Sequence, residues 1–305
     1  MKIYTLTLNP AYDVHAVCES FSAGHENLAR TTSREAGGKG VNISRAMTAN
    51  GIANTAVIVI GKDNCADFLR DLETAGLTCV LLEKEGRIRE NLTLHCANGP
   101  ETRISFAGFS VDDSILAEVE NAMDIDADTV ITFTGRVSSG ISMDSVKAFL
   151  ARAAKAGARI VLDSKSFSLE DIYEVKPWLI KPNQEEISEY FGYAVNTISE
   201  AAEKAADFAA HGVTNVMISL GEQGAMLLAG GKTYTAKPPV IHVVSTIGAG
   251  DSTIAGFIGA AGRGADAAEC LKTAVAFGTA ACLAEGTQPP CKKDVARIYS
   301  QIEMA

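Results

Sequence analysis

The segment from Ser245 to Ser252, with the sequence Ser-Thr-Ile-Gly-Ala-Gly-Asp-Ser, holds the residues best suited to chemistry. It leads from an apolar extended stretch, Pro238 to Val244, into a helix-like run from Thr253 to Gly262. Glycines at such a turn let backbone N–H groups approach a ligand, and a helix start favours an anion. Asp251 could accept a hydroxyl proton while these amides stabilise a transferring phosphoryl group. The alternative is a turn in which Asp251 only complements the helix dipole.

Two motifs near the amino terminus could hold the acceptor of such a reaction. Asp13, in Asn-Pro-Ala-Tyr-Asp, follows the first predicted strand, and open α/β sheets bind ligands at the carboxyl ends of their strands. Its carboxylate could accept two hydroxyl groups, or it could cap a turn. The segment Gly37 to Asn42, Gly-Gly-Lys-Gly-Val-Asn, begins a helix, where Lys39 and Asn42 could hold hydroxyls or a phosphate. The alternative there is a flexible turn with a solvated lysine.

Arginines form a third group in this acidic chain. Arg87, Arg89 and Arg103 lie in or near one predicted flap, and Arg136 follows a strand that ends at Thr134. Because the planar guanidinium fork suits phosphate, the group indicates an anionic substrate. The alternative is a set of exposed charges that protect a sheet edge.

The segment from Lys181 to Glu186, Lys-Pro-Asn-Gln-Glu-Glu, follows the short strand that ends at Ile180. It offers a lysine for a nucleotide phosphate and a carboxylate for Mg²⁺ or its water shell. A plain helix start, with Asn183 as the cap and two acids in the first turn, explains the same residues.

Two other glycine motifs do not match the nucleotide-binding patterns that they resemble. Gly231-Lys232-Thr233 resembles the end of a Walker A loop, but the glycine needed five positions earlier is Met226. The turn at Gly248 lacks the third glycine of a dinucleotide fingerprint, because position 253 is Thr, so NAD binding is disfavoured.

The elements that must position these residues alternate along the chain, which predicts an α/β fold with a parallel sheet and helices on both faces. Two intervals without a helix, Ala11 to Thr32 and Ile88 to Gly108, predict a small sheet beside one main domain. From Thr253 to Ile302 we expect almost only helix. The other predicted strands are Ile3 to Leu8, Thr55 to Ile60, Val80 to Leu82, Thr129 to Thr134, Arg159 to Asp163, Trp178 to Ile180 and Val216 to Leu220; the predicted helices are Gly40 to Ala49, Cys65 to Ala75, Asp112 to Ala122, Met143 to Ala156, Glu185 to Phe191 and Glu200 to His211.

Composition narrows the class of protein. With 305 residues, 47% of them hydrophobic, the chain can bury one large core. We expect a cytosolic protein, because neither a run of eighteen apolar residues nor a signal-peptide pattern is present. The seven scattered cysteines favour reduced thiols over disulfides or a zinc site. The net charge of −10 argues against nucleic-acid binding, so an anionic substrate needs a local basic cluster.

Together these segments resemble the ribokinase-type (PfkB) sugar kinases over essentially the whole chain. Gly37 to Asn42 is similar to the first signature of that family, and Thr246 to Asp251 is similar to the second. Leu8 to Asp13, Lys181-Pro182-Asn183, Ser219-Leu220-Gly221 and the stretch from Lys237 to Thr246 resemble one branch. That branch contains 1-phosphofructokinases, tagatose-6-phosphate kinases and the minor bacterial 6-phosphofructokinase.

The resemblance implies a ribokinase-like three-layer α/β/α domain over residues 1–305, with a mostly parallel sheet and a small β-sheet lid from about 11–32 and 88–108. It also implies ATP and Mg²⁺ as cofactors and a homodimer through the lid. From the charge and the apolar runs described above, we expect neither nucleic acid nor membrane as a partner. Asp251 is then the catalytic base, beside an anion hole. The remaining implied site residues are Asp13, Gly38, Lys39 and Asn42 for the sugar; Arg89 and Arg103 for its phosphate; Lys181, Asn183, Ser219, Gly221, Gly224, Thr246, Gly248, Ala249, Gly250 and Gly278 for ATP; and Glu186 near Mg²⁺.

One segment departs from the family pattern. Where the family usually has Gly-Ser-Leu-Pro before a glycine, this chain has Gly135-Arg136-Val137-Ser138-Ser139-Gly140. Arg136 could supply a new phosphate contact, or the change could mark a different sugar. We expect phosphorylation of fructose 1-phosphate at its 6-hydroxyl, with tagatose 6-phosphate or fructose 6-phosphate as alternatives. A catalytically silent sugar-phosphate sensor is the alternative from another class.

Overall fold

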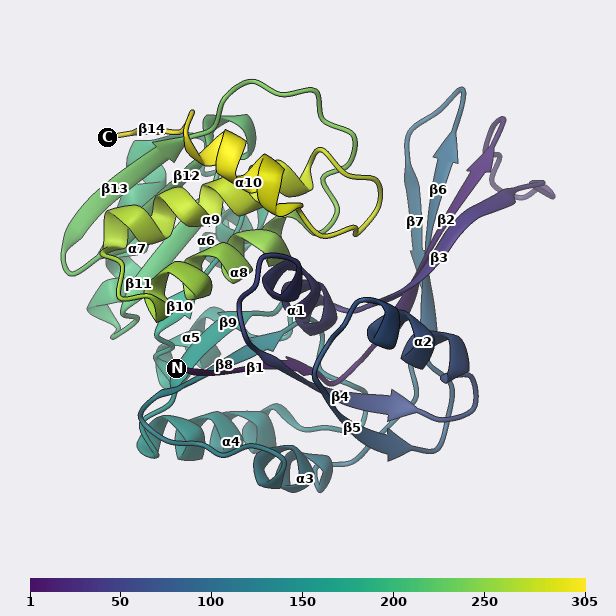
Figure 1. The fold of residues 1–305 in the computed structure, drawn as a ribbon, viewed down its shortest axis with the longest axis horizontal. Helices are drawn as coiled ribbons and strands as arrows, with labels where there is room; N and C mark the ends of the chain where they lie inside the picture. Colours follow the sequence, from purple (N-terminus) through teal and green to yellow (C-terminus); the bar gives the residue numbers. More distant parts are fainter.

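A ten-stranded sheet forms the centre of the structure, a computed structural model that describes residues 1–305 (Figure 1). Its strands are β1 (Lys2–Thr7), β4 (Thr55–Gly61), β5 (Cys79–Lys84), β8 (Thr129–Thr134), β9 (Arg159–Asp163), β10 (Leu179–Ile180), β11 (Asn215–Ser219), β12 (Ala225–Ala229), β13 (Lys232–Lys237) and β14 (Glu303–Met304). Their order is β14-β13-β12-β11-β10-β9-β8-β1-β4-β5. The strands from β11 to β5 run parallel, and β12, β13 and β14 are antiparallel additions.

Helices cover both faces of this sheet. They are α1 (Lys39–Ala49), α2 (Ala66–Thr74), α3 (Ile115–Asn121), α4 (Met143–Lys155), α5 (Leu169–Val175), α6 (Gln184–Phe191), α7 (Ile198–Ala210), η1 (Gly221–Gln223), α8 (Ala249–Gly262), α9 (Ala267–Ala281) and α10 (Lys292–Tyr299). One apolar core packs α3 to α7 against the sheet, and a second packs α1, α8, α9 and α10 against the other face. Strands covered on both faces are buried along their whole length, and every residue of β8 is buried, its three threonines included. The three-layer fold is thus confirmed.

Most predicted elements are present within a few residues. The predicted strands at Thr129–Thr134 and Arg159–Asp163 are β8 and β9, without a shift. Helix α5 and the strands β12 to β14 were not predicted. The apolar stretch from Pro238 to Val244 joins no strand, and β13 ends just before it.

The small sheet, which we call the lid, consists of β2 (Ala11–Cys18), β3 (Arg30–Gly37), β6 (Arg89–Cys96) and β7 (Thr102–Ser105), in the order β3-β2-β6-β7. It projects from the body of the molecule beside α1 and α2 (Figure 1). The lid reaches beyond the predicted limit at Thr32, because β3 stays paired with β2 until Gly37 lies opposite Ala11. Helix α1 therefore begins at Lys39, directly after the end of β3.

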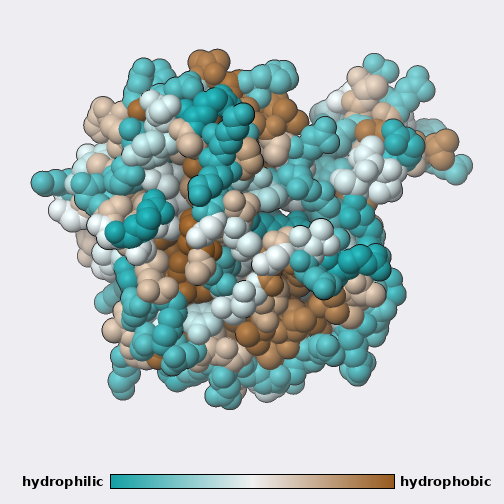
Figure 2. All heavy atoms as spheres, in the orientation of Figure 1, coloured by the Kyte–Doolittle hydropathy of each residue, from teal (hydrophilic) through white to brown (hydrophobic).

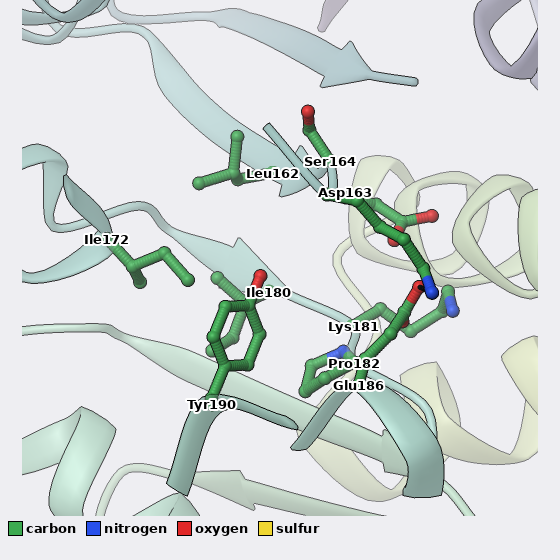
Figure 3. Close-up of a pocket in the computed structure, with 10 residues that line it drawn as sticks. Leu162, Asp163, Ser164, Ile172, Ile180, Lys181, Pro182, Glu186 and Tyr190 are labelled. Atoms are coloured by element: carbon green, nitrogen blue, oxygen red, sulfur yellow. Dashed lines mark ion pairs between the residues drawn. The ribbon is translucent and has the colours of Figure 1, made fainter. Parts of the chain in front are cut away.

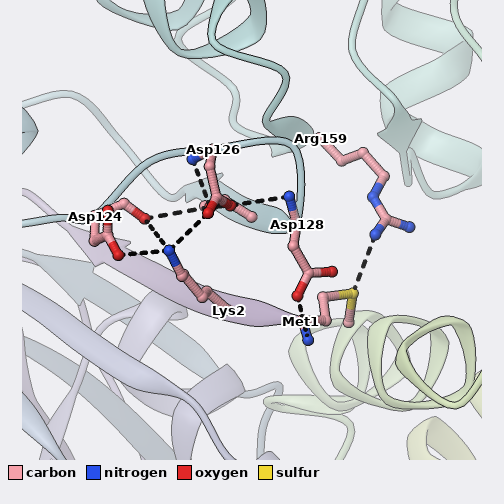
Figure 4. Close-up of polar contacts among 7 residues, drawn as sticks. Met1, Lys2, Asp124, Asp126, Asp128 and Arg159 are labelled. Atoms are coloured by element: carbon pink, nitrogen blue, oxygen red, sulfur yellow. Dashed lines mark hydrogen bonds and ion pairs between the residues drawn. The ribbon is translucent and has the colours of Figure 1, made fainter.

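The two ends of the parallel strands differ in chemistry. At the amino ends, Lys2 Nζ lies 2.5 Å from Asp124 Oδ2 and 2.8 Å from Asp126 Oδ2, in a cluster that ties β1 to the loop before β8 (Figure 4). Of the segments singled out from the sequence, four follow the carboxyl ends of parallel strands: Asn9 to Asp13 after β1, Arg136 after β8, Lys181 to Glu186 after β10, and Ser219 to Gly221 at the end of β11. Ligands of open α/β sheets bind at that edge. None of the helices is long and apolar enough to cross a membrane.

Candidate active site

The start of α8 presents backbone N–H groups without protein acceptors. Gly248 is the N-cap in a left-handed conformation, with φ of 77°, and no side chain caps the helix. The Ala249 amide donates to Thr246 O at 3.3 Å, whereas the amides of Gly250 and Asp251 donate to no protein acceptor. Unpaired first-turn amides, together with the helix dipole, favour an anion.

The Asp251 carboxylate is buried beside these amides. It is 6% exposed and accepts a hydrogen bond from Asn42 Nδ2 at 3.0 Å, so α1 and α8 meet at this residue. Burial raises the pKa of Asp251 to about 6; the positive charge of Lys39 opposes the shift and the negative charge of Asp163 adds to it. A carboxylate with this pKa is ionised at neutral pH yet basic enough to accept a proton.

Lys39 and Asp163 form an ion pair next to Asp251. The Lys39 Nζ to Asp163 Oδ2 distance is 2.9 Å, and Asp163 is almost fully buried at the end of β9. Burial alone would lower the pKa of Lys39, but the carboxylates of Asp163 and Asp251 outweigh it and raise that pKa. Burial alone would raise the pKa of Asp163, but the charges of Lys181 and Lys39 hold it low. Both groups therefore stay charged.

Asp163 was not among the residues selected from the sequence. The available signal was its place as the last residue of a predicted strand, at the edge where ligands bind. Asn91 was also missed, although it lies two residues after Arg89 in β6.

The lid brings Asp13, Asn91 and Arg89 into one hydrogen-bonded chain. Asn91 Nδ2 donates to Asp13 Oδ1 at 3.0 Å, and Arg89 Nη1 donates to Asn91 Oδ1 at 3.1 Å. Burial raises the pKa of Asp13, while the bond from Asn91 and the charges of His15, Arg89 and Arg45 oppose the rise. Arg89 Nε is buried and has no protein acceptor. Polar groups of this kind are suited to hydroxyls and an anion.

The other arginines differ in position. Arg136, exposed after β8, is close enough to Arg89 that the two positive charges repel, which adds to the lowering of the Arg89 pKa by burial. Its loop is held by the Val137 amide, which donates to Ser166 Oγ at 3.1 Å. Arg103 lies in β7 opposite Thr93, on the lid face that carries Asn91, and its Nη2 is 2.7 Å from Glu101 Oε1. Arg87 is exposed before β6.

Helix α6 begins with a capping box that involves two of the selected residues. The Glu186 amide donates to Asn183 Oδ1 at 2.8 Å, and the Asn183 amide donates to Glu186 Oε2 at 3.1 Å. The helix start that was the alternative interpretation of this segment is therefore present. In Figure 3 the charged groups of Asp163, Lys181 and Glu186 converge on one side of a small cavity of about 20 Å³. The cavity has room for about one water, so it is too small to hold a sugar phosphate or a nucleotide.

The remaining glycines selected for the nucleotide have clear structural roles. Gly224 has φ of 91°, and a Cβ there would collide with the Ala236 carbonyl oxygen. Gly278 in α9 packs against Thr253 of α8, where a Cβ would also collide. Ser219 ends β11, and its amide donates to Pro182 O at 3.1 Å, next to Gly221 at the start of η1. The nucleotide contacts of these residues remain predictions.

The whole chain is similar to known proteins. The model of the pfkB family of carbohydrate kinases matches residues 6–294. A 1-phosphofructokinase from Vibrio cholerae is 32% identical over 257 residues, 84% of this chain and 81% of that protein. A 1-phosphofructokinase from Bacillus subtilis is 30% identical over 93% of both chains.

Solved structures give the same picture of the fold. Phosphofructokinase-2 from Escherichia coli, in complex with substrates and products, superposes with a TM-score of 0.92 over 99% of both chains at 26% identity. Ribokinase from Arabidopsis thaliana, at 22% identity, superposes with a TM-score of 0.78 over 98% of both chains. At this identity, the similarity to ribokinase is evidence for a shared fold only.

Proposed function

Because the chain belongs to the pfkB family of carbohydrate kinases, we propose that it transfers a phosphoryl group from ATP to the 6-hydroxyl of fructose 1-phosphate, giving fructose 1,6-bisphosphate. The names of the relatives from Vibrio cholerae and Bacillus subtilis support this choice of sugar. Kinases of this family act on small molecules with ATP as the donor.

The proposal rests on three groups at one edge of the sheet: the carboxylate of Asp251, the unpaired amides at the start of α8, and the lid strand that carries Asp13. Asp251 lies beside the unpartnered amides of α8, and Asn42 of α1 donates to it. Helix α1 follows directly on β3 of the lid, which pairs with the strand that carries Asp13. A hydroxyl held by the lid can thus face Asp251, while a phosphoryl group lies against the amides.

Glu186 fits a role toward Mg²⁺. Its Oε2 accepts within the capping box, while its Oε1 is 3.9 Å from Lys165 Nζ and free of a hydrogen bond in the protein. Mg²⁺ in kinases is held by one or two carboxylates together with substrate phosphates, where it neutralises developing charge. The structure has no cluster of three acidic, histidine or cysteine side chains suited to a metal, so Glu186 would hold Mg²⁺ together with the phosphates of ATP.

The lid supports the proposal of a homodimer. Large hydrophobic side chains are exposed on it or near it: Phe21, Leu28, Ile104 and Phe106, with Leu28 92% exposed. Figure 2 shows hydrophobic atoms at the far end of this projecting part. Exposed apolar side chains distributed along a protruding sheet suit burial against a second copy.

The proposal is tested by ADP release with fructose 1-phosphate, fructose 6-phosphate and tagatose 6-phosphate. We expect the highest kcat/KM with fructose 1-phosphate and fructose 1,6-bisphosphate as the product. A higher kcat/KM with either 6-phosphate would overturn the choice of sugar. It would also indicate that the departure of Gly135–Gly140 from the family pattern reflects a different substrate. Tight binding of all three without ADP release would identify a sensor.

The raised pKa of Asp251 predicts an acid limit on activity. Asp251 accepts a proton only when ionised, so kcat/KM at low concentrations of both substrates should fall about tenfold per pH unit below pH about 6 and level off above it. The phosphate of the sugar titrates near the same pH. Its contribution is isolated by the Kd for fructose 1-phosphate in Asp251→Asn across the same pH range. A rate that follows this Kd alone would contradict the assignment.

Arginine replacements should act on the sugar side. Arg89→Ala and Arg136→Ala each remove charge-assisted hydrogen bonds to the sugar phosphate, worth about 1.5–3 kcal/mol each, and should raise KM for fructose 1-phosphate about tenfold or more. KM for ATP should change much less. Arg152→Ala is the matched control, because Arg152 is exposed on α4 and paired with Glu120. If Arg136→Ala behaves like the control, the Gly135–Gly140 loop is only a surface feature.

A further inference from the structure

Glu35 in the lid lies directly opposite Asp13, the residue that we assign to the sugar. The two are register partners on the antiparallel strands β3 and β2, so both carboxylates lie on one face of the lid. Like charges placed directly opposite each other destabilise a sheet unless other groups balance them. Asn91 donates to Asp13, whereas Glu35 finds its partners outside the lid.

The partners of Glu35 come from α1 and from the loop between α9 and α10. Gln288 Nε2 donates to Glu35 Oε1 at 2.6 Å, and Thr287 Oγ1 lies 3.5 Å from Glu35 Oε2. Arg45 of α1 is buried, its Nη1 is 3.9 Å from Glu35 Oε2, and its Nε has no hydrogen-bond partner. Glu35 therefore ties the lid to α1 and to this loop, whereas Ala36 and Tyr12 of the lid are bonded to the α2 side of the molecule.

The same loop contacts the turn that precedes α8. Ser245 Oγ donates to Gly286 O at 3.3 Å, and the Val244 amide donates to Cys282 O at 2.8 Å. Thr287 lies next to Gly248, since a Cβ added at Gly248 would be 3.8 Å from the Thr287 Cα atom. One short loop thus touches the lid on the sugar side and the helix start on the phosphate side.

We propose that Glu35 and Gln288 are positioning residues that couple the binding of the sugar phosphate to the binding of the nucleotide. A sugar phosphate that orders Asp13 also fixes Glu35 in the same strand pair, and Glu35 holds the loop against Gly248. A nucleotide at the start of α8 favours the same arrangement. By linkage, each ligand must then tighten the other by the same factor. The proposal rests on the proposed function for the identity of the two ligands.

The test measures four dissociation constants. Kd for fructose 1-phosphate is determined with and without a non-hydrolysable ATP analogue, and Kd for the analogue with and without fructose 1-phosphate. In the unmodified protein we expect each ligand to tighten the other by about 5- to 150-fold. In Gln288→Leu the factor should fall at least about fivefold, while each ligand bound alone changes by no more than about threefold, because the side chain of Gln288 donates to Glu35 and to none of the residues assigned to either ligand.

Two further variants separate coupling from a structural effect. The exchange Glu35→Gln with Gln288→Glu keeps a hydrogen bond between the same positions and should restore part of the factor lost in Gln288→Leu. Gln301→Leu is the matched control, because Gln301 is exposed and donates only to Arg297 O. It should leave the factor unchanged.

The outcomes distinguish this inference from the proposed function. An unmodified protein without coupling, or a Gln288→Leu variant with full coupling, overturns the inference even if fructose 1-phosphate is phosphorylated. Coupling that is present and lost in Gln288→Leu supports the inference even if no ADP is released, in which case the proposed function fails alone.

Discussion

Asp251→Asn is expected to lower kcat by about 10²- to 10⁴-fold, the usual contribution of a general base. The substitution keeps the shape of the side chain but removes the proton acceptor. The amides of Gly250 and Asp251 remain available for a phosphate, so ATP and fructose 1-phosphate should bind nearly normally. Loss of a negative charge near the phosphoryl group should slightly favour ATP. Single-turnover rates, with separate binding titrations, check the result.

A matched variant isolates the role of the helix dipole. Asp144 occupies the first turn of α4, and its side chain is almost fully exposed. Asp144→Asn should leave kcat unchanged. If Asp251→Asn keeps more than about a tenth of kcat while chemistry limits the rate, Asp251 only complements its helix, as Asp144 does.

Fructose 1-phosphate is expected to exceed free fructose in kcat/KM by about 10²- to 10⁴-fold. Free fructose leaves Arg89 and Arg136 without their anion, and charge-assisted hydrogen bonds contribute about 1.5–3 kcal/mol each. Two such losses amount to about 3–6 kcal/mol, where 1.4 kcal/mol is tenfold. Initial rates of ADP formation over a range of sugar concentrations give both constants.

The Arg89→Ala variant shows whether this preference comes from the arginines. It should lose activity with fructose 1-phosphate but keep most of its low activity with free fructose, because free fructose does not use the guanidinium group. The ratio between the two sugars should therefore shrink. An equal loss with both sugars would show that Arg89 supports the lid rather than the phosphate.

Local rules were enough for the features that depend on neighbouring residues. The strand at Thr129–Thr134 was predicted because it is an extended run between two helical ones, and the helix after Gly248 because glycines precede an apolar run. The capping box of Asn183 and Glu186 was also readable, because both residues lie within one helical turn. Parallel strands end at the same edge of a sheet, so the segments that follow them were expected to lie near one another.

Short or weakly patterned elements escaped this reasoning. Helix α5, Leu169–Val175, has only seven residues, and β14, Glu303–Met304, has two, so neither shows a clear period. The stretch from Pro238 to Val244 reads as a strand but stays unpaired, because pairing depends on a neighbouring edge that the stretch itself does not encode.

The chain by itself determined the fold class, the glycine turn before α8 and the residue types at the edge of the sheet, since each follows from local pattern. Only the tertiary structure decided the electrostatics. The Asp251 pKa of about 6 arises from burial and from the charges of Lys39 and Asp163. The hydrogen bond from Gln288 to Glu35, which joins a distant loop to the lid, also depends on the tertiary structure. These groups lie far apart in sequence and act through distance and desolvation, which are properties of the packed molecule and not of any segment.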